Sequence, residues 1–352
     1  MDQFMGEIGV IGAGIMGLTT AHALKNRGTN TLACLTEKGA HSPPGCASLM
    51  AGGMLSPLSE IENLDIATLK AAQVGMEFWK SLPQDKTGFS KTGSLLVAHN
   101  QDDYMLERFK KKLSAHKGWS NVNKNELAVL EPALAVNFSK AIFIPDEAFV
   151  NPAQVMRALA SEVAPQIVDK IDVDQCRNKF DWVIDCRGFG AAKDDPDLRG
   201  VKGEAVIVRN KDMDLKRPVR LMHPRYPFYI VPRPGHEFMI GATVIESADD
   251  TTTLKSVMEL LSAAYSFHPS FGEAEIISIM AGIRPAYPDN LPRITVDGNI
   301  IRCNGLFRHG YLLAPVMAQC VADYIAGKKN EFMPLFLREK NDNDQRRTKT
   351  AW

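Results

Sequence analysis

The hydrophobic pattern begins with an apolar run, Glu7 to Ile11, that is typical of a buried β-strand. A helix-compatible segment, Leu18 to Lys25, follows it, and a second apolar run, Thr31 to Thr36, predicts the next strand. Between the first strand and the helix stand three glycines in the spacing GxGxxG: Gly12, Gly14 and Gly17. This order predicts a βαβ unit, in which two parallel strands flank a crossover helix.

The rest of the chain alternates between helical spacing and short apolar runs. Helices are predicted at 66–82, 102–116, 125–130, 153–164, 253–265 and 313–326. Strands are predicted at 94–98, 141–144, 167–173, 182–185, 204–208, 228–231, 237–244, 275–280 and 300–304. The stretch from 201 to 244 is therefore rich in strands, whereas helices and strands alternate on either side of it.

Features of a nucleotide site recur in three separated stretches, 8–54, 167–192 and 280–326. We therefore predict an α/β protein: a discontinuous Rossmann-like domain with an inserted α+β substrate domain built on a mixed or antiparallel sheet. The expected boundaries put 1–80, 146–203 and 279–337 in the Rossmann-like domain, 81–145 and 204–278 in the substrate domain, and 338–352 in a polar tail.

Charge and composition narrow the function classes without changing this fold. The 352 residues carry 41 Lys+Arg and 41 Asp+Glu, so the formal net charge is zero and gives no support for nucleic-acid or membrane-surface binding. No apolar run approaches the length of a transmembrane helix, and the N-terminus lacks a basic segment and a signal h-region. We expect a cytoplasmic protein with no nucleic-acid or membrane partner.

The cysteines and histidines predict no metal site and no disulfide framework. The six cysteines are scattered, and no CxxC is present. Buried thiols in a reducing compartment are the simplest interpretation. The eight histidines show no metal-ligand spacing.

The glycines of the first turn predict a dinucleotide site. Gly12 permits a tight turn, Gly14 lets the backbone approach a pyrophosphate, and Gly17 lets the helix pack on the strand. The phosphates would bind at the helix N-terminus, where free N–H groups and the helix dipole favour negative charge. A tight turn without a ligand is the alternative. Further cofactor contacts are expected in the same turn: Ala13, Ile15 and Met16.

Glu37 extends this site, because it follows the second apolar run, twenty residues after Gly17, where a carboxylate can hydrogen-bond a ribose. Lys38 follows it. A run of small residues comes next and suggests close backbone approach to something flat, with a flexible loop as the alternative. The cofactor contacts expected in this run are Ala47, Ser48, Ala51, Gly52, Gly53 and Met54.

A second buried strand, Trp182 to Asp185, ends in a turn with Cys186 and Gly188, and Val168 lies in the strand before it. A parallel sheet that binds its ligand at the strand C-termini can bring both turns side by side. An NAD dehydrogenase needs the first half-site but leaves the later glycines unexplained. A permanently held FAD, expected to be non-covalent, accounts for all of them.

The final helix could point its N-terminus at the N1/C2=O side of the flavin, where reduction leaves negative charge. The contacts expected there are Arg308, His309, Gly310, Tyr311, Leu312 and Leu313. Three residues would form a substrate clamp, because arginine binds a carboxylate bidentately and a phenol adds a hydrogen bond: Tyr229, Arg284 and Arg308. A structural ion pair is the alternative for Arg284.

Six motifs carry a resemblance to a known family. They are 9–17 (GVIGAGIMG), 47–57 (ASLMAGGMLSP), 229–233 (YIVPR), 241–243 (GAT), 282–285 (GIRP) and 307–315 (FRHGYLLAP). In this order the sequence resembles the D-amino-acid oxidase family of flavoproteins, and within it the bacterial glycine oxidases of thiamine biosynthesis. The resemblance spans nearly the whole chain.

The resemblance implies an FAD enzyme that oxidises an amine next to a carboxylate. Arg284 would hold the carboxylate with help from Tyr229, and Arg308 would lie near the ring or the site entrance. The α-hydrogen would leave as hydride to flavin N5, and oxygen would reoxidise the flavin to give hydrogen peroxide. The imine would hydrolyse to ammonia and a 2-oxo acid, glyoxylate for glycine, or feed thiazole assembly. The implied partners are a small amino-acid substrate and oxygen, and a homo-oligomer is left open.

Two positions depart from the glycine-oxidase pattern, which has His at Pro227 and Met at Val244. Both positions line the pocket in the family, so the preferred amine stays open between glycine, sarcosine and small D-amino acids. Two alternatives to an oxidase remain. One is a dehydrogenase of the same fold with a quinone-type acceptor, and the other is a flavin-binding partner without turnover.

Overall fold

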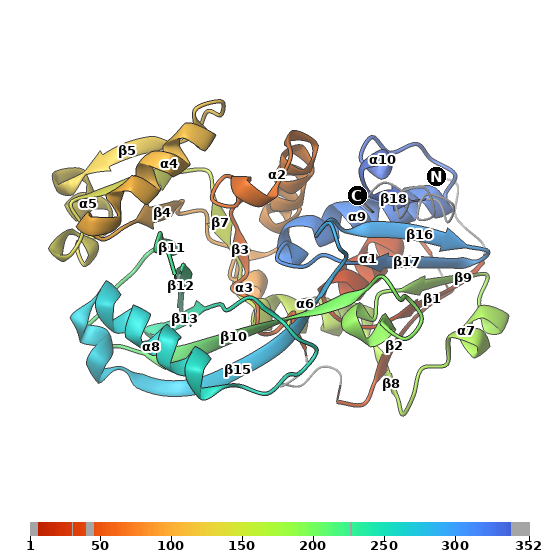
Figure 1. Cartoon of the computed structure of the whole chain (residues 1–352). Coiled ribbons are helices and arrows are strands. Elements are labelled where there is room, and N and C mark those ends of the chain that lie inside the picture. The colour runs from red at the N-terminus through yellow and green to blue at the C-terminus, as the bar shows by residue number, and fades with distance from the viewer. Residues whose placement is uncertain (1–5, 30, 40–45, 226, 339–352) are drawn as a thin grey trace, which may run out of the picture. The chain divides into compact units, whose positions relative to one another are not determined.

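The computed structural model of the chain describes residues 6–29, 31–39, 46–225 and 227–338 (Figure 1). The chain divides into two compact units. Unit one comprises 1–49, 155–201 and 283–352, and unit two comprises 50–154 and 202–282. The predicted polar tail lies outside the described residues from 339 onward.

Unit one is a doubly wound sheet with its helices. Its elements are β1 (Glu7–Ile11), α1 (Ile15–Asn26), β2 (Thr31–Glu37), most of α6 (Pro152–Val163), β8 (Gln166–Val168), α7 (Val173–Lys179), β9 (Trp182–Asp185), η4 (Gly188–Ala191), β16 (Arg293–Asp297), β17 (Ile300–Asn304), α9 (Gly310–Ile325), α10 (Met333–Phe336) and β18 (Leu337–Arg338). The sheet order is β18-β16-β17-β9-β1-β2-β8. Strands β17, β9, β1, β2 and β8 are parallel to one another, whereas β16 pairs with β17 in the antiparallel sense.

The five parallel strands of unit one have a diagnostic order. Numbered along the chain as β1, β2, β8, β9 and β17, they stand in the order 3-2-1-4-5. This is the Rossmann order, and its switch point lies between β1 and β9. In such sheets the ligand binds outside the carboxyl ends of the strands at that point. The glycine turn after β1 is therefore where the topology predicts a ligand.

Unit two is built on a second, mixed sheet. Its helices are η1 (Ile61–Asn63), α2 (Ile66–Ser81), α3 (Gln84–Thr87), η2 (Asn100–Asp102), α4 (Asp103–Leu113), α5 (Lys124–Leu130), η3 (Leu134–Val136), α8 (Leu254–Phe267) and η5 (Pro269–Glu273). Its strands are β3 (Met54–Leu55), β4 (Ser94–Val97), β5 (Ser120–Asn123), β6 (Lys140–Ile144), β7 (Ala148–Phe149), β11 (Val219–Leu221), β12 (Phe228–Arg233), β13 (Glu237–Gly241) and β14 (Ile245–Glu246). Two further strands, β10 (Arg199–Arg209) and β15 (Glu275–Ala286), belong mainly to unit two.

The sheet of unit two runs β14-β10-β13-β12-β11-β4-β6-β5, with β15 paired to β10. Strands β11 and β4 are parallel, whereas β10–β13, β13–β12, β12–β11, β4–β6 and β6–β5 are antiparallel. Apolar side chains of the central strands, including Val206, Ile230 and Phe238, share one core cluster with residues of α8 such as Phe267. The predicted fold class, an α/β protein with a mixed second sheet, is confirmed.

The unit boundaries differ from those expected from the sequence. Residues 50–80 and 146–154 lie in unit two, although the pattern placed them with the nucleotide domain. Pairing of β3 with β7 joins these two stretches to each other. Glu147 also accepts hydrogen bonds from Ser59 and Ser94, which lie on either side of α2. Such long-range contacts leave no signal in local hydrophobic spacing.

Two predicted strands were wrong in their extent. The strand expected at 237–244 ends at Gly241, and β14 begins only at Ile245. The strand expected at 167–173 occupies 166–168, and Asp172 instead caps helix α7 by accepting from the N–H groups of Asp174 and Gln175. Asp at an N-cap satisfies N–H groups that the helix leaves without partners.

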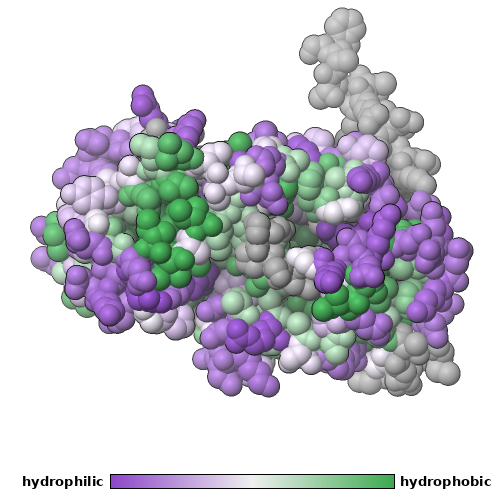
Figure 2. Space-filling model, turned by 90° about the horizontal axis from the view of Figure 1, so that it is seen from below, coloured by the Kyte–Doolittle hydropathy of each residue, from purple (hydrophilic) through white to green (hydrophobic). Residues whose placement is uncertain are grey.

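An apolar surface lies on α8 and β15 of unit two. Figure 2 shows apolar atoms gathered over this part of the chain. The exposed apolar side chains are Leu254, Met258 and Tyr265 on α8, and Ile276, Ile277 and Ile279 on β15. Contiguous exposed apolar surface is typical of an interaction site.

No helix within the described ranges is long and apolar enough to cross a membrane.

Glu147 is a fully buried carboxyl group in unit two. Its side chain accepts from the Ser59 N–H (2.7 Å), the Ser59 hydroxyl (2.6 Å) and the Ser94 hydroxyl. Burial raises the pKa of Glu147 to about 7, because removal from water disfavours the charged form more than these hydrogen bonds favour it.

The free energy of unfolding should therefore fall as pH rises through this range. The folded protein holds a proton on Glu147 up to about pH 7, whereas the unfolded chain releases it near the ordinary value of 4.5. Between these values stability drops by about 1.4 kcal/mol per pH unit from this group alone. Denaturant titrations should show that Glu147→Gln removes this slope and that Glu77→Gln, on an exposed carboxyl of α2, keeps it. An unchanged slope in Glu147→Gln would contradict the assignment.

Candidate dinucleotide site and substrate residues

The turn after β1 requires glycine at two positions. Gly12 has a φ of +94°, and a Cβ there would lie 2.6 Å from the carbonyl oxygen of Cys186. At Gly17 a Cβ would lie 1.7 Å from the carbonyl oxygen of Gly12. Both distances are shorter than any van der Waals contact, so each glycine is needed for close backbone packing. The predicted roles of Gly12 in the turn and Gly17 in helix packing agree with this geometry.

Backbone hydrogen bonds hold this turn at the switch point of the sheet. The Gly12 N–H donates to Leu35 O of β2, and the Cys186 N–H donates to Ile11 O of β1, both at 2.8 Å. Ile11 and Asp185 are register partners in the parallel β1–β9 pair. The turns after β1 and β9 are therefore adjacent, as the sequence predicted.

Ser48 connects the N-terminal ends of helices α1 and α9. Its hydroxyl oxygen accepts from the Ile15 N–H (3.0 Å), and its carbonyl oxygen accepts from the Tyr311 hydroxyl (2.8 Å). A Cβ on Gly310 would lie 3.4 Å from the Ile15 side chain, so the two helix ends are close. Four expected cofactor contacts are thus brought together: Ile15, Ser48, Gly310 and Tyr311.

Both helix N-termini are suited to an anion or a developing negative charge. Helix α1 begins after Gly14 and helix α9 after His309. Neither helix has an acidic residue in its first turn, and neither N-cap residue caps its helix with a side chain. Ser48 accepts from the first N–H group of α1, that of Ile15. Unsatisfied N–H groups and the helix dipole favour negative charge at these ends. The remaining residues predicted in these two segments are Ala13, Met16, Leu312 and Leu313, all buried.

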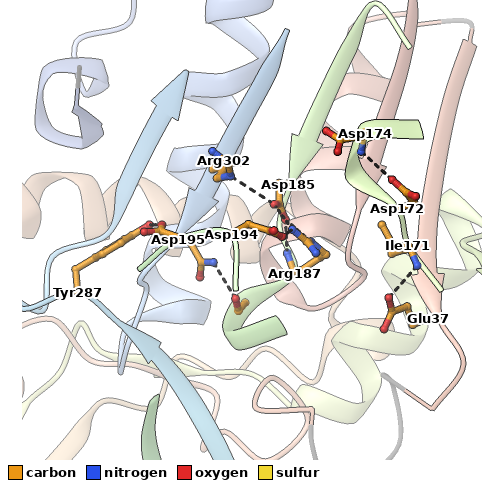
Figure 3. Close-up of polar contacts among 12 residues, drawn as sticks. Glu37, Ile171, Asp172, Asp174, Asp185, Arg187, Asp194, Asp195, Tyr287 and Arg302 are labelled. Carbon is orange, nitrogen blue, oxygen red and sulfur yellow. Dashed lines mark hydrogen bonds and ion pairs between the residues drawn. The ribbon is translucent and has the colours of Figure 1, made fainter. Parts of the chain in front are cut away.

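Glu37 is oriented by the loop that follows β8 (Figure 3). One of its carboxylate oxygens accepts from the Ile171 N–H at 2.8 Å. The Lys38 N–H donates to Val168 O at 2.9 Å, and Glu37 and Val168 are register partners. These contacts fix the end of β2 beside β8. A second hydrogen bond, donated by a ribose hydroxyl to Glu37, stays a prediction.

An ion-pair network holds the turn after β9 (Figure 3). Arg187 donates from Nε and Nη2 to the two oxygens of the buried Asp185, at 2.9 and 2.8 Å, and from Nη2 to Asp194 at 2.5 Å. Burial would lower the pKa of Arg187, but these two carboxylates raise it above its ordinary value. Arg302 of β17 lies 3.7 Å from Asp185. Asp185 and Arg187 therefore form a structural ion pair that fixes the turn before Gly188.

The segments that carry the two predicted clamp arginines meet in unit one. The Phe307 N–H donates to Pro285 O at 3.0 Å, so the residues following Arg284 and preceding Arg308 are joined. The carbonyl oxygen of Gly188 accepts from the Asn304 side chain at 2.9 Å. Arg308 is exposed and Arg284 is half-buried.

The small-residue run is shared between the two units. Ala47 and Ser48 lie in unit one, and Ala51, Gly52, Gly53 and Met54 lie in unit two. Arg233 donates from Nη2 to Gly52 O at 2.7 Å, and the Val150 N–H donates to Gly53 O at 2.8 Å. A Cβ on Gly53 would lie 2.3 Å from the carbonyl oxygen of Val150. Packing within unit two therefore requires glycine at position 53, whereas a Cβ on Gly52 would make only ordinary contacts, the nearest at 3.5 Å. Contact of both glycines with a cofactor stays a prediction.

Tyr229, the third predicted substrate residue, lies in a charged network in unit two. Its hydroxyl donates to the Glu60 carboxylate. Arg220 lies on β11 as the register partner of Tyr229 on β12, and its guanidinium carbon is 5.6 Å from the centre of the Tyr229 ring. Glu60 and Arg220 are both buried.

Sequence reasoning missed Glu60, Arg220 and Glu147. Glu60 and Glu62 follow directly on the small-residue run, which is the one signal that could have drawn attention to them. Arg220 could not be found, because its place beside Tyr229 depends on the register of β11 against β12. No cluster of three or more metal-ligating side chains occurs among the residues that the structure describes.

The family profile of the FAD-dependent oxidoreductases (DAO) matches residues 7–324. The chain belongs to this family. A protein of Rhizobium etli named as a thiamine biosynthesis oxidoreductase, ThiO, is 43% identical over 89% of this chain and 94% of its own length. The glycine oxidase of Bacillus subtilis is 26% identical over 92% of this chain and 94% of its own length. The crystal structure of glycine oxidase from Geobacillus kaustophilus matches with a TM-score of 0.80 at 24% identity, covering 96% of this chain and 99% of that one.

The residues of unit one fit the FAD that this family uses. The turn at Gly12 and Gly17 leaves no room for side chains, and the N-terminus of α1 has no acidic residue near it. Such a turn at a switch point is suited to a pyrophosphate. The adenosine end would lie toward Glu37, and the N-terminus of α9 would lie toward the flavin, with Cys186 and Gly188 in the adjoining turn.

Gly17→Ala should yield a protein that purifies without FAD. The new methyl group would overlap the carbonyl oxygen and carbon of Gly12. These are backbone atoms, which cannot move aside as the end of a flexible side chain could. Visible absorbance of the purified protein, normalised to its protein content, measures the bound flavin. Gly190→Ala is the matched control, since its Cβ would make only an ordinary contact at 3.6 Å. Equal flavin content in both variants would show that the turn does not bind the cofactor.

Proposed function

We propose that the protein oxidises glycine or a similarly small D-amino or N-methyl amino acid. The observation that carries this proposal is the likeness, along about nine-tenths of the chain, to the ThiO of Rhizobium etli at 43% identity and to the glycine oxidase of Bacillus subtilis at 26%. The products would be an imine, then ammonia and a 2-oxo acid, which is glyoxylate when glycine is the substrate. Hydrogen peroxide would be the second product.

The chemistry that bound, non-covalent FAD supplies is acceptance of the substrate's α-hydrogen as a hydride at N5, with transfer of the electrons to oxygen. The chain's own residues would bind and orient the substrate. Arg284 would hold the carboxylate as a bidentate ion pair, with Tyr229 adding a hydrogen bond. Arg308, which is exposed, would act at the entrance or near the ring. Orientation of this kind needs no side chain as an obligatory base.

The name of the Rhizobium etli relative supports a place in thiamine biosynthesis. There the imine of glycine would be the useful product for thiazole assembly. Pro227 and Val244 are exposed in unit two and replace the His and Met expected of glycine oxidases. The preferred amine is therefore the part of the proposal that needs a direct test.

A substrate screen tests the reaction. The purified yellow protein should release peroxide with glycine, sarcosine or D-alanine in air, as measured by a peroxidase-coupled assay. Turnover with a quinone or dye but not with oxygen would instead identify a dehydrogenase. A bound flavin that none of these amines reduces would exclude amino-acid oxidation.

Arg284→Ala should reduce kcat/KM for the best amine strongly. Loss of the carboxylate contact should cost about 2–4 kcal/mol of transition-state binding, or about 30- to 1000-fold in rate. The control is Arg157→Ala, the same change at an exposed arginine on α6. Both variants should retain flavin. Activity of Arg284→Ala close to that of the control would remove Arg284 from the substrate site.

A further inference from the structure

Tyr229 has a single hydroxyl proton, and it donates that proton in a hydrogen bond to Glu60. The hydrogen bond runs from the Tyr229 hydroxyl to Oε1 of the buried Glu60. A phenol offers one donor only. The proposed role of Tyr229 is to donate to a substrate carboxylate, so the substrate and Glu60 would compete for the same proton.

Arg220 is placed to stabilise the negative charge of Glu60 when the Tyr229 hydroxyl donates to the substrate instead. Its Nη1 donates to the carbonyl oxygen of Ser59, the residue before Glu60, and its Nη2 lies 3.3 Å from Glu62. The described residues provide no hydrogen-bond partner for Arg220 Nε, although the side chain is 91% shielded from water. Arg220 therefore holds a spare donor next to the Glu60 segment.

The charges around this network are balanced. Burial would lower the pKa of Arg220, but Tyr229, Glu60 and Glu62 raise it, so the guanidinium stays charged. Glu62 is also paired with Lys112 of α4 at 2.7 Å. Loss of Arg220 would leave the buried Glu60 without this positive charge, whereas loss of Glu60 would leave Arg220 paired with Glu62.

We propose that Glu60 and Arg220 form a proton-donor switch for Tyr229. In the resting protein the Tyr229 hydroxyl donates to Glu60. When a carboxylate ligand binds, the O–H bond rotates from Glu60 to the ligand, and Arg220 compensates the charge left on Glu60. No proton is transferred, since only the direction of the hydrogen bond changes. Glu60 and Arg220 are thus positioning residues for substrate binding, and this inference rests on the proposed function of Tyr229.

Substitutions of Glu60 and of Arg220 should change the affinity for a carboxylate ligand in opposite directions. Glu60→Gln weakens the competitor and should tighten binding of a carboxylate ligand, by about fivefold or more. Arg220→Met leaves Glu60 without compensation when Tyr229 turns away, so binding should weaken by at least about tenfold. The double variant removes both charges and should return near the wild-type affinity. A purely structural role predicts weaker binding in all three variants.

Arg220→Met should also create a pH dependence. Protonation of Glu60 at low pH would remove the charge that Arg220→Met leaves uncompensated. Affinity of the variant should therefore recover as pH falls, whereas wild-type affinity stays flat above the pKa of the ligand. Arg220 also pairs with Glu62, which in turn pairs with Lys112, and Ser59, the residue before Glu60, donates to Glu147. Because the pKa of Glu147 lies at about 7, the pH series is repeated in a Glu147→Gln background.

The experiment is a titration of the FAD-loaded protein with acetate, which has a carboxylate but no oxidisable amine, followed by the flavin absorbance. The controls are Arg217→Met and Glu131→Gln. These residues form another buried Arg–Glu pair in unit two, 2.9 Å apart. Both control variants should bind acetate as the wild type does. Arg220→Lys should restore much of the affinity lost in Arg220→Met.

A background without the phenol separates proton competition from simple charge effects. In Tyr229→Phe, the Glu60→Gln change should tighten acetate binding clearly less than it does in the wild type. An undiminished effect, or equal affinities in Glu60→Gln, Arg220→Met and wild type, would overturn the switch. A wild-type flavin spectrum that acetate never perturbs would overturn the carboxylate site of the proposed function and the switch with it.

Discussion

The structure of unit one depends on a contact between two backbone turns that tolerates no side chain. Gly12 passes so close to Cys186 that even a methyl group would overlap its carbonyl oxygen. Hydrogen bonds from Gly12 to Leu35 and from Cys186 to Ile11 fix three neighbouring strands, β2, β1 and β9, around that contact. Because the strand order reverses there, the turn opens on the edge of the sheet where α1 and α9 also begin. The cofactor site follows from this arrangement.

This constraint explains why the glycine turn that is expected to bind the cofactor could be predicted from the sequence. A glycine that must lie against another backbone cannot vary, and the spacing of Gly12, Gly14 and Gly17 after an apolar run records that need locally. The alternation of strands and helices likewise records the parallel sheet. Ser48 was found for the same reason, since it lies in a run of small residues close to that turn. The family match over residues 7–324 agrees with these local signals.

The sequence was less informative about unit two, where the important contacts join distant segments. Residues 50–80 and 146–154 lie in unit two and not in the nucleotide domain where the sequence placed them, and pairing of β3 with β7 joins these two stretches. The place of Arg220 beside Tyr229 depends on strand register, and Glu60 contacts Tyr229 from the turn that precedes η1. Neither contact leaves a periodic pattern. Tyr229 itself was singled out from the sequence as a phenol that could bind a carboxylate, but its hydrogen bond to Glu60, which changes what it can donate, was not predicted.

The central claim is that unit one binds FAD and that this FAD oxidises a small amino acid. Anaerobic mixing of the purified protein with glycine, followed by visible absorbance and then by admission of air, tests it most directly. The account predicts that the substrate bleaches the flavin and that oxygen restores its colour with release of peroxide. A flavin that stays oxidised with glycine, sarcosine and D-alanine, or a purified protein without flavin, would contradict it.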